Sequence, residues 1–372
     1  MFLDANGKPL SEGVRLKQPD LASTLSRLRA RGPAFLYAGA DGQIFAEEVR
    51  RIGFDLTYRD LKAALPIWRS TLRVPFVHDT NLHFAMPRTP SGTMAAKMAA
   101  MLIDDDRYKD AKPSERAHLT SEAIQRAIAD GANGFKTVTV EREFNFANKA
   151  RKIATLSFTQ IADGYAEQLM AGYQTGQLTQ LAQQGSDVSI SKHPGGETSF
   201  SVVDLRGGAV ACAFTMNGAF GTGRAVPGTG IFLANSTSSP ATRDLSMATV
   251  LVDHQFLDKF YMVGAASGGA ASQAVLTQIS IAAALKEKTN LETEMADRRR
   301  VFRDVVGRIT YVETGAPIDF VNNLKQRGHR TVAVPSLARV NIALCDNGLP
   351  AKKTQCRINT DPRGFGYATT PE

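Results

Sequence analysis

The feature that most constrains the fold of this 372-residue chain is a pair of short runs of β-forming residues in its second half. Ser199–Asp204 reads SFSVVD and Ala209–Asn217 reads AVACAFTMN, with the spacer LRGG at Leu205–Gly208 between them. Two runs of β-branched and aromatic residues around a short glycine-containing spacer predict a β-hairpin. Ala248–Asp253 and Phe260–Gly269 are further strand-like runs, so the second half is predicted to form a sheet.

The first half of the chain carries helical patterns instead. Leu21, Leu25 and Leu28 recur at helical spacing, and Gly32–Pro33 ends that run. Further helices are expected over Tyr58–Leu65, Ser91–Ile103, much of Thr120–Gly176 and, later, Ser272–Lys288. The polar stretch Leu181–Gly196 is predicted to be a loop or linker between the two zones.

The net charge of +8 at pH 7 does not lead us to expect a nucleic-acid partner. The basic residues are spread along the chain rather than gathered in one patch. The densest cluster is Arg298, Arg299, Arg300, Arg303 and Arg308. It lies in a helical pattern, TEMADRRRVFRDVVGRI, so we expect a solvated helix face. No apolar stretch reaches the roughly 18 residues that span a bilayer, and the first residues lack the apolar region of a signal peptide.

The chain has three cysteines, Cys212, Cys345 and Cys356. Their spacing does not match a zinc site, and no metal or organic cofactor is expected. Cys212 lies in an apolar strand-like run and is predicted to be a core residue. Cys345 and Cys356 flank the loop DNGLPAKKTQ and could pair in an oxidising compartment.

Several segments, taken in order, match segments of one known family. The longest, ETSFSVVDLRGGAVACAFTMNGAFGTGRAVPGTGIFLAN, resembles the start of the family's small, catalytic subunit. The segment LKQPDLASTLSRLRARGPAFLYAG resembles a helix and turn of the large subunit. Shorter matches are MPRTPSG (Met86–Gly92), LSMATVLV (Leu245–Val252), GAASGG (Gly264–Gly269) and TDPRG (Thr360–Gly364). Their shared order covers nearly the whole chain, which therefore resembles the γ-glutamyltranspeptidase family.

The resemblance implies the α+β fold of N-terminal-nucleophile hydrolases, an αββα sandwich of two antiparallel sheets packed face to face and covered by helices. It implies that residues 1–190, mainly helical, correspond to a large subunit without its N-terminal part. Residues 197–372 would correspond to the small subunit, and the two would form one domain. Part of a sheet should then stay uncovered, open to a second chain or to self-association. Family members are commonly exported.

The family's chemistry directs attention to the start of the first β run. There the precursor cuts itself before a threonine, whose freed α-amino group then activates the hydroxyl for attack on a γ-glutamyl amide such as glutathione. Thr198 is the candidate nucleophile, and Ser199 is the runner-up. An ungapped match of SVVD places Glu197 at the family's nucleophile position and Thr198 one residue later. A slip of one residue turns a strand side chain to the opposite face.

The other candidate catalytic residues follow from the same matches. Gly268 and Gly269 match the glycines of the family's oxyanion hole, where a backbone without Cβ can aim N–H groups at a developing negative charge. The alternative is a simple turn after a strand. Thr215 matches a threonine that supports the nucleophile, and Asn217 matches an asparagine at the amino end of the substrate.

The substrate-binding matches include the main departure from the family. Ser246 and Met247 match the pair that contacts the substrate carboxylate. Ser238 and Ser239 replace an acidic pair that neutralises the substrate ammonium, which removes a charge-assisted hydrogen bond of about 1.5–3 kcal/mol. Asn235 remains as a weaker acceptor.

Two functions are therefore expected from sequence. The first is a γ-glutamyltransferase-like or glutathione-hydrolase-like enzyme that acts on γ-glutamyl or related small amides after self-cleavage. The alternative is a catalytically silent family member that serves as a binding or structural subunit. Self-cleavage between Glu197 and Thr198 is expected to be poor, because a glutamate occupies the matched nucleophile position.

Overall fold

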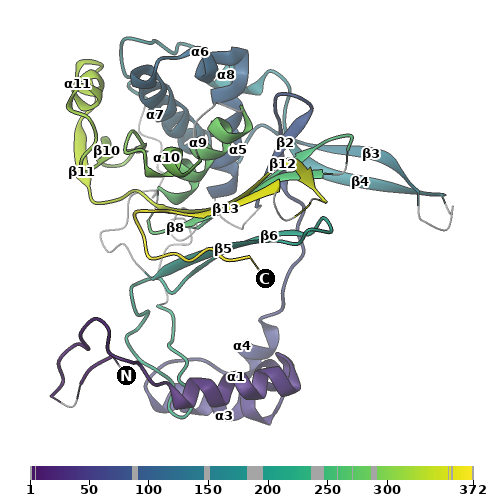
Figure 1. Ribbon diagram of the computed structural model, residues 1–372, viewed down its shortest axis with the longest axis vertical. Coiled ribbons are helices and arrows are strands. Elements are labelled where there is room, and N and C mark those ends of the chain that lie inside the picture. Colours follow the sequence, from purple (N-terminus) through teal and green to yellow (C-terminus); the bar gives the residue numbers. More distant parts are fainter. Residues whose placement is uncertain are drawn as a thin grey trace. The chain divides into compact units, whose positions relative to one another are not determined.

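The computed structural model describes residues 2–4, 6–85, 91–145, 151–181, 196–235, 247–257, 259–269, 271–285, 291–350, 352 and 355–370 (Figure 1). The chain divides into two compact units. Met1–Trp68 and Phe220–Asn235 form the first, here called the helical unit, and Arg69–Ala219 and Ser236–Glu372 form the second, the sheet unit. The boundary predicted between residues 190 and 197 falls largely outside the described residues.

The helical unit is built from short amphipathic helices. They are α1 (Pro19–Arg31), α2 (Ala34–Tyr37), α3 (Ala40–Arg51) and α4 (Tyr58–Ala63). Helix α4 begins with a capping box, in which the Thr57 hydroxyl accepts from the Asp60 amide and the Asp60 carboxylate accepts from the Thr57 amide. Phe45 and Val49 of α3 pack with Val226 in the core of this unit. The helices predicted around Leu21–Leu28 and over Tyr58–Leu65 are confirmed.

The sheet unit is organised around an eight-stranded sheet with the order β13-β12-β8-β7-β2-β1-β4-β3. The strands are β1 (Leu72–Pro75), β2 (Thr80–Phe84), β3 (Phe135–Asn145), β4 (Arg151–Ile161), β7 (Ala248–His254), β8 (Lys259–Ser267), β12 (Arg339–Leu349) and β13 (Cys356–Thr360). Neighbouring strands are antiparallel except β1 and β4, which are parallel.

The predicted hairpin forms a second sheet of two strands, β5 (Glu197–Val203) and β6 (Ala209–Thr215). Both strands lie against β8, while β5 also contacts β12 and β6 contacts β7. Exposure alternates along β5, so one face points to the larger sheet and the other away from it. The outer face carries Phe200 and Phe214, which are 45% and 51% exposed and whose ring centroids lie 5.8 Å apart.

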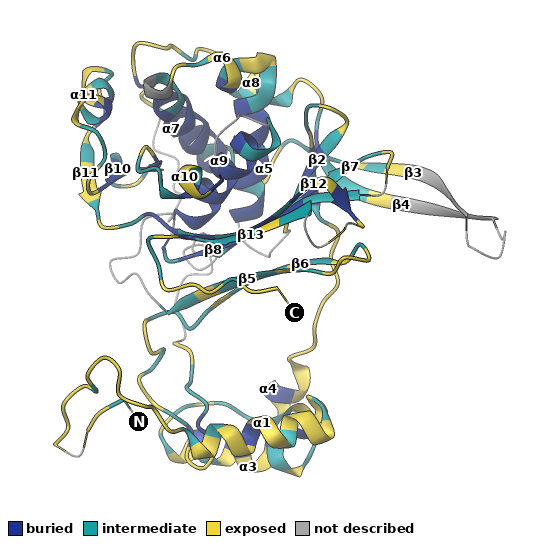
Figure 2. Cartoon of the chain, viewed as in Figure 1, coloured by how far each residue is buried: buried dark blue, intermediate teal, exposed yellow. Residues whose placement is uncertain are grey.

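Helices cover the opposite face of the eight-stranded sheet. The long ones are α5 (Ser91–Ile103), α7 (Pro113–Asp130) and α9 (Ser272–Ala284), and their buried residues dominate that layer in Figure 2. Shorter helical segments are η1 (Asp104–Asp106), α6 (Arg107–Asp110), α8 (Tyr165–Leu169), α10 (Leu291–Ala296) and α11 (Ile318–Gln326). Two sheets packed face to face, with helices behind the larger one, confirm the predicted α+β sandwich.

A third, small sheet corrects the prediction of a solvated arginine helix. It consists of β9 (Val301–Asp304), β10 (Ile309–Glu313) and β11 (Thr331–Val334). Helix α10 ends at Ala296, and Arg300 and Arg303 are only 4% and 5% exposed. The short pattern of apolar residues fits a helix as well as a strand, and pairing of β9 with β10 decides between them because it buries Phe302 completely.

The structure decides three other sequence predictions. Helix does not fill much of Thr120–Gly176, because β3 and β4 form a long hairpin whose Thr–Val alternation has a period of two. Cys345 and Cys356 form a disulfide between β12 and β13. Cys212 is half-buried on β6 rather than a core residue, because it lies on the strand face that also carries Phe214.

No helix in the described ranges combines the length and the apolar character that a membrane span requires.

Candidate active site

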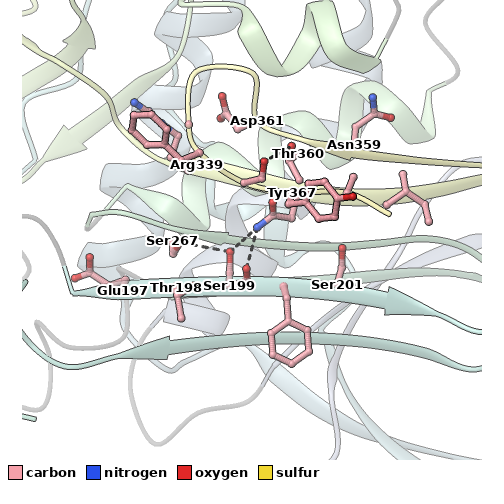
Figure 3. Close-up of a pocket in the computed structure, with 17 residues that line it drawn as sticks. Glu197, Thr198, Ser199, Ser201, Ser267, Arg339, Asn359, Thr360, Asp361 and Tyr367 are labelled. Atoms are coloured by element: carbon pink, nitrogen blue, oxygen red, sulfur yellow. Dashed lines mark hydrogen bonds between the residues drawn. The ribbon is translucent and has the colours of Figure 1, made fainter. Parts of the chain in front are cut away.

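A pocket of about 500 Å³ lies where β5 of the hairpin meets β12 and the C-terminal segment (Figure 3). It is lined by Glu197–Ser201 of β5, Ser267 at the end of β8, Arg339 and Asn341 of β12, Ile358–Asp361 around the end of β13, and Gly364–Ala368. The pocket therefore joins segments that are far apart in the sequence, and strand pairing brings them together.

Ser199 is the hydroxyl best placed inside this pocket. Its Oγ accepts a hydrogen bond of 3.0 Å from Asn341 Nδ2 and donates to Ser267 Oγ at 3.4 Å. Asn341 Nδ2 also donates to the Ser199 carbonyl at 3.0 Å, so one amide holds both the backbone and the side chain of this serine (Figure 3). These contacts hold the hydroxyl in one orientation at the pocket.

Thr198 and Glu197 lie on opposite faces of β5. Figure 3 shows Glu197, Ser199 and Ser201 on the side of the pocket and the Thr198 side chain turned away from it. This is the result of the side-chain period of two in a strand. The role of Thr198 as nucleophile stays a prediction, and its hydroxyl would need a change of strand phase to face the pocket.

Thr215 and Asn217 lie beside the first residue of β5. Thr215 is the direct cross-strand partner of Glu197, and its Oγ1 accepts from the Asn217 amide at 2.9 Å. Asn217 has a positive φ of 54°, and this turn ends β6. The Met216 amide donates to the Gly196 carbonyl at 2.7 Å and so ties the two strand ends together. The structure therefore places this predicted pair close to the start of β5.

Gly268 and Gly269 follow Ser267 directly, at the point where β8 turns into α9. Their φ values of 98° and 137° are in a region that favours glycine, so the turn requires residues without Cβ. The Gly269 carbonyl accepts from the Ser272 amide at 3.0 Å and from the Ser272 hydroxyl at 2.8 Å. The turn is rigidly attached to the helix and adjoins the pocket through Ser267.

The predicted substrate-binding residues fall in different places. Met247 immediately precedes β7 at the end that pairs with the Ser267 end of β8. Ser246, like Ser238 and Ser239, lies outside the described residues. Asn235 belongs to the helical unit, where its Nδ2 donates to the Gly221 carbonyl at 2.8 Å.

Sequence reasoning missed the contribution of β12. Asn341 and Arg339 alternate with Val340 and Ile342, which are fully buried, so the polar residues share the face toward β5. This alternation is visible in the sequence RVNI, but nothing local shows that its polar face lines a site. The partner strand, more than a hundred residues away, decides that.

A buried ionic cluster supports the pocket from behind. Arg363 donates from Nε and Nη2 to Asp361 at 2.8 and 2.7 Å and also pairs with Glu313. Burial alone would lower the pKa of Arg363, but the Asp361 and Glu313 carboxylates outweigh burial, so the net pKa is raised. The Leu337 amide donates to Glu313 at 2.9 Å, so the cluster also holds the chain just before β12.

Within the described residues no group of three or more histidine, cysteine or acidic side chains is arranged to hold a metal ion. The pocket instead offers hydroxyls, an amide and a guanidinium. Such groups suit attack on a carbonyl carbon and stabilisation of the oxyanion that follows.

This architecture, a hairpin sheet packed on a larger sheet with helices behind it, is the fold of the N-terminal-nucleophile hydrolases. The family model of γ-glutamyltranspeptidase matches residues 1–370, and the chain belongs to that family.

Individual relatives are more distant. A glutathione hydrolase proenzyme of Bacillus subtilis subsp. natto is 25% identical over 363 residues, covering 87% of this chain and 57% of the relative. An acylase ACY 1 proenzyme of a Pseudomonas species is 26% identical over 62% of this chain and 38% of its own length. The crystal structure of a cephalosporin acylase from Bacillus halodurans superposes with a TM-score of 0.67 at 18% identity, covering 99% of this chain and 65% of that chain. The chain thus spans less than two thirds of these relatives.

Proposed function

We propose that this chain hydrolyses or transfers the acyl group of a small γ-glutamyl or related amide, and that the Ser199 hydroxyl is the attacking group. The observation that carries the proposal is the position of this hydroxyl inside the pocket, 3.0 Å from Asn341 Nδ2. Membership of the family and the names of the relatives, glutathione hydrolases and an acylase, support the class of reaction.

On this proposal the chain first cuts its own Thr198–Ser199 peptide bond. Ser199 Oγ attacks the Thr198 carbonyl carbon, an ester forms as the C–N bond breaks, and the nitrogen takes up the hydroxyl proton. Water then hydrolyses the ester and leaves a carboxylate on Thr198 and a free α-amino group on Ser199. An α-amine has a pKa of about 8, so near neutral pH it can accept the proton of its own hydroxyl.

Turnover follows the same chemistry on the substrate. Ser199 Oγ attacks the amide carbonyl, the acyl–oxygen bond forms, and the amine leaves with a proton from the α-ammonium. The groups that we propose to stabilise the oxyanion are Asn341 Nδ2, which donates to Ser199, and the glycine turn that follows Ser267. Water or an acceptor amine then releases the acyl group, which makes hydrolysis and transfer two outcomes of one intermediate.

One observation favours the second candidate function, that of a catalytically silent family member that binds small amides. Glu197 takes the first position of β5 on the pocket face, paired across to Thr215, and a carboxylate there cannot act as an N-terminal nucleophile. A chain that stays intact would keep this carboxylate in the pocket and bind small amides without cutting them.

Mass spectrometry of the purified chain separates these candidates. Cleavage before Ser199 leaves fragments 1–198 and 199–372, and cleavage before Thr198 leaves fragments 1–197 and 198–372. We expect Ser199→Ala to abolish cleavage, and Thr198→Ala to preserve it. Ser201→Ala is the matched control, since Ser201 lies two residues further along the same face.

Release of amine from a γ-glutamyl anilide supplies the second measurement. We expect Ser199→Ala to lower the rate by about 10³-fold or more, and Ser201→Ala to leave most of it. Loss of cleavage in Thr198→Ala but not in Ser199→Ala would transfer the role to Thr198. An intact wild-type chain that releases no amine would establish the silent member instead.

A further inference from the structure

One wall of the pocket belongs to an edge strand. β13 stands at the end of the eight-stranded sheet, and in the part of the chain that the structure describes β12 is the only strand paired with it. Residues Ile358–Thr360 of β13 line the pocket, and Thr360 lies directly opposite Asn341, which holds Ser199. A strand with a single neighbour opens more readily than a central strand, because one row of hydrogen bonds holds it. Whatever fixes β13 therefore also fixes the pocket wall.

The two ends of β13 are tethered in different ways. Just after its far end, Asp361 pairs with Arg363 and accepts from the Val340 amide. At its near end, Cys356 is joined by the disulfide to Cys345, the residue directly opposite on β12. The far tether is ionic and buried, whereas the near tether is a covalent bond that a reductant can open.

The side-chain contacts described beside the disulfide are weak. The Arg357 guanidinium donates to Asp346 at 2.8 Å, and both side chains are exposed. A surface ion pair of this kind adds little to stability. The Lys259 ammonium donates to the Asn347 carbonyl at 3.2 Å, again in an exposed position. Once the disulfide opens, the start of β13 is therefore held mainly by its backbone pairing with β12.

β13 can also leave the sheet without unfolding it. None of its residues is buried, whereas Val340 and Ile342 of β12 are fully buried. Detachment of β13 therefore exposes little apolar surface, and the hydrophobic effect opposes it only weakly. Local opening of such a segment requires less free energy than unfolding of the whole unit. Reduction is thus expected to change the pocket before it changes the rest of the sheet.

The two sulfurs differ in their access to solvent. Cys345 is 1% exposed, whereas Cys356 is partly exposed. The thiolate of a small thiol reductant therefore attacks the Cys356 sulfur, the S–S bond breaks, and Cys345 leaves as a thiolate that takes up a proton. A second reductant thiolate attacks the reductant sulfur of the mixed disulfide, which releases Cys356 and forms the disulfide of the reductant. Two electrons pass from the reductant to the cysteine pair.

We propose that the Cys345–Cys356 disulfide is a redox switch for the pocket. The oxidised pair keeps β13 in place as a wall, and reduction frees the start of this strand and opens the pocket beside Asn341 and Ser199. The oxidised chain is then the form that turns over amides. Control of turnover rests on the proposed function, whereas release of β13 does not.

Hydrogen–deuterium exchange of the full chain, followed by mass spectrometry, tests the release of β13. The chain is oxidised with diamide or reduced with dithiothreitol, and a thiol count should rise from one to three on reduction. We expect protection of the β13 amides to fall by about a hundredfold, which corresponds to a loop-closure contribution of about 3 kcal/mol. Amides of β7 and β8 should stay protected. Unchanged protection of β13 in a chain with three thiols, or three thiols after diamide, overturns the switch.

Variants separate the disulfide from other effects of the reductant. In the Cys345→Ser/Cys356→Ser double variant, β13 should exchange quickly with and without dithiothreitol. Cys212→Ser is the matched control, because Cys212 is the free cysteine and lies on β6, and this variant should respond to dithiothreitol as wild type does. Protection of β13 in the double variant that equals that of oxidised wild type overturns the inference.

Release of amine from a γ-glutamyl anilide tests the control of turnover. We expect the oxidised chain to be about tenfold or more faster than the reduced chain, because a displaced wall misplaces the substrate. Dithiothreitol should not change the rate of the double variant. Equal rates in the two forms, with β13 released, would overturn the control of turnover and leave the proposed function standing. Release of β13 in a chain that never releases amine would support the redox-sensitive wall and count against the proposed function.

Discussion

The two faces of the eight-stranded sheet differ sharply, although the same strands supply both. Toward α5, α7 and α9 they present apolar side chains such as Leu82 and Phe84 of β2 and Val250 of β7, none more than 1% exposed. Toward the hairpin side they present Asn81 of β2 and Asp253 of β7, with Asn81 Nδ2 donating to Asp253 at 2.8 Å.

This comparison shows that the residues that stabilise the fold and the residues of the candidate site lie on opposite faces of the sheet. The helix face is closely packed and dry, so it supplies most of the burial that favours folding. The other face carries hydrogen-bonded polar groups and supports β5 with its pocket. Substitutions on the helix face should therefore change the free energy of unfolding, and those in the pocket should change binding and turnover first.

The largest effect is expected from Phe84→Ala. Phe84 is fully buried beneath the helices, and loss of its ring should lower the free energy of unfolding by about 3–5 kcal/mol. Urea titration followed by circular dichroism measures this. Phe256→Ala is the control, since Phe256 is 68% exposed and should cost far less. Similar losses in both variants would contradict the dominant contribution of the buried helix face to stability.

The second effect concerns the disulfide between β12 and β13 beside the pocket wall. Cys345 and Cys356 are separated by 11 residues, and opening such a loop should cost about 3 kcal/mol by the chain-entropy estimate. A Cys345→Ser/Cys356→Ser double variant should show that loss in urea titration, and a reductant should add nothing to it. Cys212→Ser controls for the free cysteine. A double variant as stable as wild type would show that the strand pairing alone holds this edge.

The third effect is an acid sensitivity on the helix side. Arg303 donates to the Thr310 hydroxyl, which donates to His329 Nδ1. His329 Nε2 donates to His118 Nδ1, and His118 Nε2 donates to the Gln174 carbonyl. Every hydrogen bond in this chain is made with both imidazoles neutral. Burial, then the nearby His118 and Arg303, lower the pKa of His329 to about 3. Burial is also the main cause that lowers the pKa of His118.

The sign of the pH effect follows from this depression. The unfolded chain takes up protons near the ordinary histidine pKa of about 6.5, and the folded chain does so only at lower pH. The stabilisation is therefore complete above about pH 6.5 and declines toward pH 3, by about 2 kcal/mol at pH 5 for His329 alone. Urea midpoints from pH 8 to 4 measure it. His329→Gln should reduce the loss of stability at acidic pH. His78→Gln should not, because His78 is exposed. An equal pH dependence in wild type and both variants would show that His329 does not cause the loss.

The smallest effect is expected for Asp253→Asn on the hairpin side. Burial raises the pKa of Asp253, but the adjacent His83 imidazole and the hydrogen bond from the Asn81 amide outweigh that effect, so the net pKa is lowered. The carboxylate is 27% exposed and 3.1 Å from His83, so we expect a loss of about 0.5–1 kcal/mol that fades at high salt. If the free energy of unfolding falls by about 3 kcal/mol or more in the same urea titration, this face of the sheet also contributes strongly to stability.

Much of the fold could be read from local pattern, since the period of side chains depends on each segment alone. The hairpin and helix α5 appear where the sequence predicts them, because alternation or helical spacing there is unambiguous. The prediction of helix failed at β3–β4, although the Thr–Val alternation there has the period of a strand. It failed at β9 because a short mixed pattern suits both periods, and pairing with β10 decides.

By itself, the sequence determined the sandwich class, the family and the approximate start of the candidate site. An ungapped match also placed Glu197 at the family's nucleophile position and Thr198 one residue later. Only the tertiary structure decided that Ser199, rather than Thr198, faces the pocket, and that Asn341 and Arg339 complete its wall. The physical reason is that alternation places neighbouring residues on opposite faces, whereas the packing of β5 against β8 and β12 selects which face becomes the site.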